Sequence, residues 1–234
     1  MEKIVITGMG TVNPIGLSVR ESWENAINGV SGVGPITLFD TENWASEWLV
    51  KIACEVKNFD PARYMEPREA RRRDRFEQMA SAAAKEAIEQ SGLEITDANR
   101  ARIGVIVSSA IGGLKSLQDA IFTLKDEGAR KVSPFLIPML MSNGASGLIA
   151  IDYGIKGPCF SVASACASGA DGIGTALVMM RAGLMDACIA GASEHTICAT
   201  GVGAFDRIGA MSRRNDDYSM TPQPVAVFIE GLRG

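Results

Sequence analysis

The sequence predicts an α/β protein, with a mainly parallel mixed sheet covered by layers of helices. Three observations lead to this fold class. Strand-like runs alternate along the chain with helical stretches, which is the order expected when helices connect parallel strands. The run at residues 102–109 is continuous and rich in β-branched residues, as in a central strand covered on both faces. The chain also has 25 glycines but only 6% aromatic residues, which favours close packing through small side chains.

Capping residues and glycines delimit the expected elements. Ser18 and Glu21 form a capping box that starts the first helix. Gly92 ends the second, because glycine readily adopts the left-handed conformation that terminates helices. In chain order, the sequence predicts strand 4–8, helix 18–28, strand 51–56, helix 69–91, strand 102–109, helices 114–126, 134–141 and 145–153, strand 160–165 with a small-residue helix after it, strand 186–191 and helix 201–208.

Composition argues against several classes of protein. The formal net charge of −4 is unsuited to general nucleic-acid binding. No apolar stretch is long enough to span a membrane, and the N-terminus leads directly into a strand-like run without a signal peptide. Five cysteines without a C-x-x-C pair, and a single histidine, argue against a disulfide framework or a zinc site. We therefore predict reduced thiols and no metal.

Cys166 is the leading candidate nucleophile. It lies where a strand-like run meets a small-residue helical run, so we expect it in the first turn of a helix at the carboxyl end of a strand. Unpaired backbone N–H groups at such a position stabilise a thiolate. The alternative is a buried structural cysteine, the role expected of Cys54, Cys159 and Cys188 in strand-like runs. Cys198 lies in a loop-like stretch that allows exposure, but nothing marks it as reactive.

His195 is the only histidine in the chain. It follows the next strand after Cys166, so parallel strands would allow both side chains to lie at one edge of the sheet. One interpretation is a Cys–His dyad of the hydrolase kind. The other, favoured by its sequence context, is an ordinary loop histidine.

Residues 63–75 form a basic cluster. Six arginines against three acidic residues leave a local charge of +3 in a chain whose net charge is −4. One interpretation is a solvated helix start, but arginines at a helix N-terminus oppose the helix dipole. The cluster therefore indicates a docking surface for an acidic partner or a phosphate, which Arg130 and Lys131 would extend. The glycine pairs of the chain match neither a dinucleotide fingerprint nor a P-loop.

Six short motifs occur in a fixed order along the chain. They are Ile4-Val-Ile-Thr-Gly-Met-Gly-Thr-Val-Asn-Pro-Ile-Gly, Ser109-Ala-Ile-Gly-Gly-Leu, Arg130-Lys-Val-Ser-Pro-Phe, Tyr153-Gly-Ile-Lys-Gly-Pro, Ser164-Ala-Cys-Ala-Ser-Gly and Gly201-Val-Gly-Ala-Phe. In order and spacing this set resembles the β-ketoacyl-acyl-carrier-protein synthases, the condensing enzymes of fatty-acid synthesis. The resemblance is closest to the elongating, type II synthases. Each motif alone is weak, but the ordered set is specific.

The resemblance implies the N-terminal half of a thiolase-like fold, in which two similar halves stack as α-β-α-β-α layers. It also implies a homodimer in the cytoplasm or in an organelle stroma or matrix, without a cofactor. Cys166 would take an acyl group from acyl carrier protein as a thioester. Malonyl-carrier protein, whose malonyl group is also phosphopantetheine-linked, would then lose carbon dioxide, and its carbanion would attack that thioester. The product would be a 3-oxoacyl chain longer by two carbons.

The resemblance implies roles for other residues as well. Ile111 matches a residue that gates the acyl pocket near the dimer interface, and Phe205 matches another position that lines this pocket. Five basic residues match positions that face the acidic carrier protein in the family: Arg68, Arg71, Arg72, Arg130 and Lys131.

The chain departs from the family in length and at its end. Family members are nearly twice as long, and their second half supplies two histidines that stabilise the decarboxylation enolate, a lysine and a Gly/Phe loop that completes the oxyanion hole. His195 matches none of these.

The resemblance covers residues 1–216, whereas 217–234 diverge, as expected of a truncated or frameshifted product or a fragment. We expect this chain to accept acyl groups without decarboxylating malonyl thioesters. The alternatives are an inactive remnant that binds the carrier protein and a Cys166/His195 thioester hydrolase.

Overall fold

The chain folds into two units in the computed structural model, which describes residues 3–42, 44 and 47–218. Unit 1 comprises Met1–Val12 and Asp60–His195, and unit 2 comprises Asn13–Phe59 and Thr196–Gly234. Almost all of the divergent tail predicted at 217–234 lies outside the described residues.

A parallel pair of strands lies at the centre of unit 1. β3 (Ile103–Ser108) pairs with β4 (Ala187–Ala192), and Ser108 lies opposite Ala192 in the register. Both strands therefore end at the same edge of the sheet. All residues of β3 are buried, as predicted for the run at 102–109. This edge is where the candidate site residues of unit 1 follow the strands.

The strand predicted at 160–165 does not form, and the only bridge to β3 among the described residues of this segment lies just before it. A single parallel bridge pairs Val105 with Cys159. Farther along, the Val162 N–H donates to the Ser108 hydroxyl at 3.2 Å, so a side chain replaces the backbone acceptor of a regular ladder. The segment nevertheless runs alongside β3 and brings the chain to the same sheet edge.

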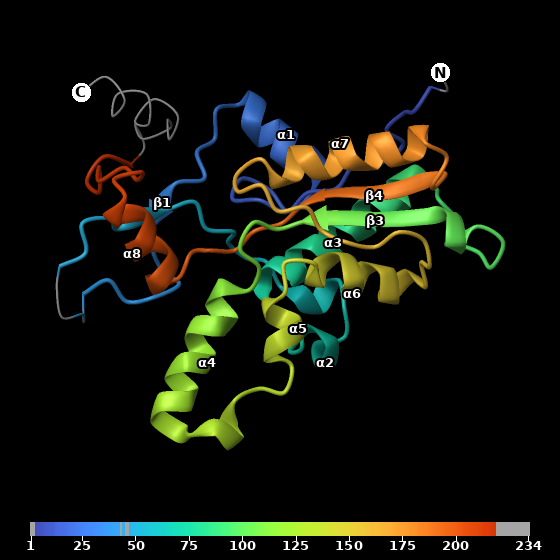
Figure 1. Cartoon of the computed structure of the whole chain (residues 1–234). Helices are drawn as coiled ribbons and strands as arrows, with labels where there is room; N and C mark the ends of the chain where they lie inside the picture. Colours follow the sequence, from blue (N-terminus) through green and yellow to red (C-terminus); the bar gives the residue numbers. More distant parts are fainter. Residues whose placement is uncertain (1–2, 43, 45–46, 219–234) are drawn as a thin grey trace. The chain divides into compact units, whose positions relative to one another are not determined.

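Helices cover both faces of this sheet (Figure 1). α7 (Ser168–Arg181) lies over one face and packs against β3 and β4. On the opposite face, α6 (Gly144–Tyr153) packs against β3, and α3 (Arg75–Ser91) packs against α6. This is the covered, layered sheet that the sequence predicts.

Successive residues of β3 point to opposite helical layers. Val105 packs in a buried cluster with Phe76 of α3 and Ile149 of α6. Ile106 packs instead with Ala176 of α7. This alternation follows from the two-residue period of a strand. Small side chains allow the close approach predicted from composition; the buried alanines of the first cluster are Ala80, Ala84, Ala145 and Ala150.

The helix predicted at 69–91 is two helices, α2 (Pro67–Ala70) and α3. Asp74 separates them, because its extended backbone begins α3 as an N-cap. Its N–H donates to the Glu77 carboxylate at 2.8 Å, which completes a capping box. Gly92 ends α3 in the left-handed conformation, with φ +65°, as predicted.

The chain between β3 and α6 forms two further helices. α4 (Leu114–Glu127) extends away from the sheet in Figure 1, and α5 (Leu136–Leu140) packs against it. Both helices were predicted. The described residues of unit 1 also form short 3-10 turns, which are η1 (Pro61–Arg63), η2 (Arg100–Arg102) and η3 (Ala129–Lys131).

The described part of unit 2 contains two helices and a small antiparallel pair of strands. The helices are α1 (Val19–Ile27), capped by Ser18 as predicted, and α8 (Ala199–Arg207). β1 (Gly34–Pro35) pairs with β2 (Ile52–Ala53), which is shorter than the strand predicted at 51–56. The ladder stops there because the buried Glu55 carboxylate binds the N–H and hydroxyl of Thr37, at 2.8 and 2.6 Å. Within the described part of the chain, no helix combines the length and apolarity needed to cross a membrane.

The buried strand predicted at residues 4–8 is wrong. This segment forms no strand, and Ile6 is 83% exposed. Side chains of α3 hold the chain that follows, with Gln90 accepting the Met9 N–H at 2.6 Å. A β-branched run needs a partner strand to be buried, and its own sequence does not specify that partner.

Glu77 gives the stability of unit 1 a pH dependence. It is fully buried, and this burial raises the pKa of its carboxyl to about 8, a shift that the Asp74 N–H bond only partly opposes. The folded pKa lies above the reference value of 4.5, so the folded protein holds a proton that the unfolded chain releases. The contribution of Glu77 to stability is therefore greatest below pH 4.5 and decreases as the pH rises through about 8.

We expect Glu77→Gln to weaken this decrease, because glutamine can still accept the Asp74 N–H but carries no charge. Between about pH 5 and about pH 8, the wild-type free energy of unfolding should fall by at least about 1 kcal/mol more than that of the variant. Urea unfolding at the two pH values measures the difference. If the free energy of unfolding changed equally with pH in the two proteins, the burial of an ionisable carboxyl at Glu77 would be contradicted.

Candidate active site

Cys166 lies in a tight turn that leads into α7. The helix begins at Ser168, so Cys166 precedes its first residue by two positions instead of lying in its first turn as predicted. Ala165, just before it, has φ +52°, in the left-handed region that residues with a Cβ rarely adopt. Cys166 itself is exposed. An exposed thiol in a strained strand-to-helix turn is a geometry found at nucleophiles.

Two polar side chains of α7 hold this turn in place. The buried Ser168 hydroxyl accepts the Ser164 N–H at 2.9 Å and donates to the Ala165 carbonyl at 2.7 Å. The Asp171 carboxylate accepts the Ser164 hydroxyl. A strained residue such as Ala165 persists only when its surroundings fix it. Sequence reasoning missed both side chains, although the serine spaced four residues from Ser164 was a signal for a local turn.

The other cysteines lie in different environments. Burial raises the pKa of Cys188 to about 12, which keeps that thiol protonated. Cys54 and Cys159, predicted in the core, are exposed residues, yet partial burial of their thiols raises the pKa of both. Cys198 is fully buried at the N-cap position of α8, so the exposure allowed by its loop-like sequence is not found. These environments favour Cys166 as the reactive thiol.

Ile111 lies in the loop that follows β3. The Ser109 N–H donates to the Ser161 hydroxyl at 3.4 Å, so this loop begins beside the segment that leads to Cys166. Ile111 is 41% exposed. His195 is partly buried and lies three residues beyond the end of β4. These residues of unit 1 therefore follow neighbouring strands at one sheet edge.

Phe205 belongs to unit 2. It lies on α8 and is 38% exposed. Its role in lining a pocket stays a prediction.

The basic residues of the predicted docking surface come from two segments that meet. The Arg72 guanidinium lies 4.7 Å from the centre of the Phe135 ring and also binds Glu69 at 3.1 Å. This cation–π contact joins the end of α2 to the chain just after η3. Arg72 is partly buried, and the other four predicted residues are exposed: Arg68, Arg71, Arg130 and Lys131.

Arg73, part of the basic run at 63–75, belongs to the core. It is 4% exposed, and its guanidinium donates to both Asp152 oxygens at 2.6 and 2.7 Å and to Ser81 at 2.8 Å. The Asp152 bond raises the pKa of Arg73 although burial opposes it. The run therefore combines a structural arginine with surface ones, which composition alone does not distinguish.

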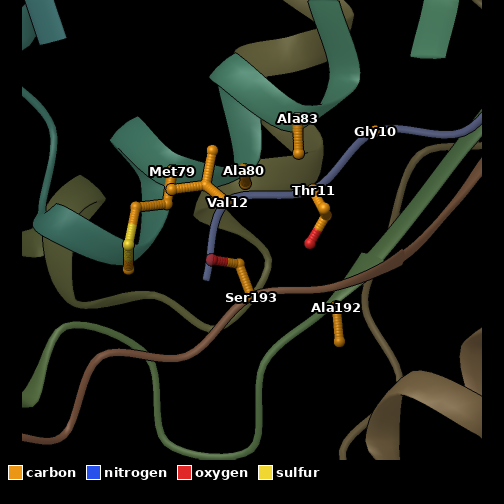
Figure 2. A pocket seen from close by; sticks show the side chains of 8 residues that line it. All are labelled: Gly10, Thr11, Val12, Met79, Ala80, Ala83, Ala192 and Ser193. Carbon is orange, nitrogen blue, oxygen red and sulfur yellow. The ribbon is translucent and has the colours of Figure 1, made fainter. Parts of the chain in front are cut away.

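A small cavity lies between the N-terminal segment, α3 and the end of β4 (Figure 2). Its volume is about 80 Å³, well below the roughly 300 Å³ of small ligand sites. None of the predicted site residues lines it. Its lining residues are Gly10, Thr11, Val12, Met79, Ala80, Ala83, Ala192 and Ser193. Across residues 3–42, 44 and 47–218, no group of three or more histidine, cysteine or acidic side chains could hold a metal ion.

Comparison with known proteins gives one consistent family. Residues 1–223 match the family "Beta-ketoacyl synthase, N-terminal domain". The 3-oxoacyl-[acyl-carrier-protein] synthase 2 of Staphylococcus aureus (strain N315) is 42% identical over 233 residues, which cover 100% of this chain and 54% of that protein. The chain therefore spans about half the length of the curated relatives it matches.

Solved structures agree with this match. A beta-ketoacyl synthase from Burkholderia phymatum STM815 has a TM-score of 0.81 and 26% identity, covering 95% of this chain and 54% of that one. A ketosynthase of a type II polyketide synthase, solved in complex with its acyl-carrier protein, has a TM-score of 0.75 and 21% identity. It covers 91% of this chain and 56% of that one, and at this identity it bears on the fold alone.

Proposed function

The chain belongs to the β-ketoacyl synthase family, whose N-terminal domain it matches over residues 1–223, and we propose that it supplies the acyl-accepting half of a 3-oxoacyl-acyl-carrier-protein synthase. The observation that carries this proposal is the exposed Cys166 in a strained turn fixed by Ser168 and Asp171. Such a turn presents a sulfur to a large substrate while the backbone behind it stays fixed.

The proposed reaction is thioester exchange followed by condensation. The Cys166 sulfur attacks the carbonyl carbon of an acyl-phosphopantetheine thioester, the bond to the carrier sulfur breaks, and the leaving carrier thiolate takes up the proton that Cys166 loses. In the whole enzyme, malonyl-carrier protein then loses carbon dioxide. Its carbanion attacks the acyl-cysteine carbonyl, which releases the Cys166 thiolate and a 3-oxoacyl-carrier protein. Ile111 is the residue of unit 1 that we assign to the acyl pocket.

Intact-protein mass spectrometry tests the acylation step. After incubation of residues 1–234 with acyl-carrier protein, we expect the mass to rise by one acyl group, and peptide mapping should locate it on Cys166. An unchanged mass, or an adduct on another cysteine, would contradict the proposal. The comparison with malonyl-carrier protein present tests whether the chain also condenses.

We assign docking of the acidic carrier protein to the exposed residues Arg68, Arg71, Arg130 and Lys131, together with Arg72. Two observations support this role: the cation–π contact between Arg72 and Phe135 brings the two basic segments together, and the surface is positive in a chain of negative net charge. A structure of the same fold was solved with an acyl-carrier protein bound to its ketosynthase. Complementary charge of this kind steers an acidic partner and sets its orientation.

Arg71→Glu is expected to weaken carrier-protein binding about tenfold at low salt, and the loss should shrink as salt screens the charges. Fluorescence anisotropy with labelled carrier protein measures the affinity. Lys156→Glu is the matched control, because Lys156 is exposed, lies just beyond α6 and gives the same change in net charge. Equal losses in both variants would mean that only the overall charge matters.

We also propose a homodimer and a reducing compartment, the cytoplasm or an organelle stroma or matrix. Exposed apolar side chains on α4 and α5 support the dimer, with Ile121, Leu124 and Ile137 as examples. The free cysteines fit a reducing compartment. Sedimentation over a range of concentrations measures the oligomeric state, and a monomer at all of them would contradict the dimer.

A further inference from the structure

A single carboxylate binds the loop that carries Ile111. One Glu194 oxygen accepts the Ala110 N–H at 2.8 Å and the Ile111 N–H at 3.4 Å. The other oxygen accepts the Ser109 hydroxyl at 3.1 Å, and that hydroxyl accepts the Gly112 N–H at 2.8 Å. The first half of the loop is therefore held by the Glu194 carboxylate, which comes from beyond the end of the neighbouring strand, β4, and by the Ser109 hydroxyl that this carboxylate binds.

The second half of the loop is held by backbone contacts. The Gly113 N–H donates to the Leu140 carbonyl at 3.2 Å. Gly112 has φ +75°, and a Cβ at this position would lie 2.2 Å from the same carbonyl oxygen, so the chain passes close to the end of α5. Ile111 lies between these two attachments. Unlike the attachment at Gly113, the Glu194 attachment is made by a side chain from outside the loop.

We propose that Glu194 is a positioning residue that fixes Ile111 and thereby sets which acyl chains Cys166 accepts. The inference rests on the proposed function, in which Ile111 limits the acyl pocket. Removing the carboxylate leaves the Ala110 and Ile111 N–H groups to water and releases the loop at its start. Without this attachment, the Ile111 side chain can move more readily. Longer acyl chains can then enter the acyl pocket.

Three substitutions at Glu194 distinguish the contribution of its hydrogen bonds from those of its charge and length. Alanine removes every acceptor. Glutamine keeps one oxygen for the Ala110 and Ile111 N–H groups, and its amide can donate to the Ser109 hydroxyl, so the loop should stay fixed. Aspartate keeps the charge but is one methylene shorter, so it should give an intermediate result. Glu194 is exposed, and these changes are not expected to unfold the chain; thermal unfolding of each variant checks this.

Hydrogen exchange measured by mass spectrometry tests the loop directly. In Glu194→Ala, the amides of Ala110 and Ile111 should exchange at least about tenfold faster than in the wild type, because their acceptor is lost. Glu194→Gln should remain close to the wild type. Glu94→Ala is the control, since it removes an exposed carboxylate from the chain that precedes β3. Wild-type exchange in Glu194→Ala would overturn the inference.

Acylation of Cys166 by carriers loaded with hexanoyl or tetradecanoyl groups tests the specificity. The ratio of the tetradecanoyl to the hexanoyl rate should rise at least about fivefold in Glu194→Ala and return towards the wild-type value in Glu194→Gln. An unchanged ratio with Cys166 still acylated would overturn the inference and leave the proposed function intact. If the wild type forms no acyl-Cys166, the proposed function fails, and the exchange result alone decides whether Glu194 positions the loop.

Discussion

Replacing Cys166 with alanine is expected to lower acyl transfer from the carrier protein by at least about a thousandfold, because covalent catalysis has no substitute once its nucleophile is removed. The Ser168 and Asp171 hydrogen bonds are made by neighbouring residues, so the turn should persist around the smaller side chain. Intact-protein mass spectrometry over a time course with acyl-carrier protein measures the rate. Circular dichroism should show an unchanged fold.

Cys159→Ala is the matched control for this result. Cys159 is also an exposed residue on the segment that leads to Cys166, but partial burial of its thiol raises its pKa. Its loss should leave acylation at the wild-type rate. Persistent acylation of the Cys166→Ala variant would mean that another group is the nucleophile.

His195→Ala distinguishes the proposed acyltransferase from a Cys–His hydrolase. In a hydrolase dyad the imidazole activates both the sulfur and the water that releases the acyl group, so turnover to free acid would stop. In the proposed function the acyl adduct should still form. Unchanged thioester hydrolysis by the variant would remove the hydrolase alternative, whereas loss of both adduct and hydrolysis would favour it.

The sequence predicted those parts of the fold whose signals are local. The β3 run is buried along its whole length, and α4 and α6 begin and end close to the expected residues. The thiolase-like layered fold is confirmed by the likeness to the Burkholderia phymatum synthase. Two local errors have different causes. The capping box of Asp74 and Glu77 was visible in the sequence but overlooked, whereas the strand at 4–8 depended on pairing that no local pattern specifies.

In the candidate site, too, only the features with a local sequence signal could be predicted. The strand-to-helix change around Cys166 placed the thiol to within two residues. Glu194 could not be found by spacing, since its contacts with Ser109 and Ala110 span 85 and 84 residues of sequence. They exist because β3 and β4 are parallel and in register, which brings the ends of both strands together. Similarly, nothing in the arginine-rich sequence at 63–75 marks Arg73 as the buried member; only its pairing with Asp152 does.

Arg73→Met is expected to lower the free energy of unfolding by about 2–4 kcal/mol, the largest stability effect that we predict for a single substitution. The change removes two hydrogen bonds to Asp152 and one to Ser81, and leaves the Asp152 carboxylate, one-third exposed, without its partner. Two features make the expected loss of stability smaller than the loss from breaking a fully buried ion pair. Water still reaches Asp152, and the Arg73 Nε has no hydrogen-bond partner among the described residues.

A double-mutant cycle with Asp152→Asn isolates the ion pair from the packing of the arginine stem. Because the charge on Asp152 is costly only when Arg73 is missing, adding Asp152→Asn to Arg73→Met should recover part of the lost stability. Arg72→Met is the control: Arg72 is more exposed, and its contacts with Glu69 and Phe135 should contribute about 1 kcal/mol or less. If the two arginine variants lost equal stability and the second substitution recovered none, Arg73 would have to be a surface residue like its neighbours. Recovery by Asp152→Asn would instead establish that this arginine joins the start of α3 to α6, and that only the remaining basic residues are available to a partner.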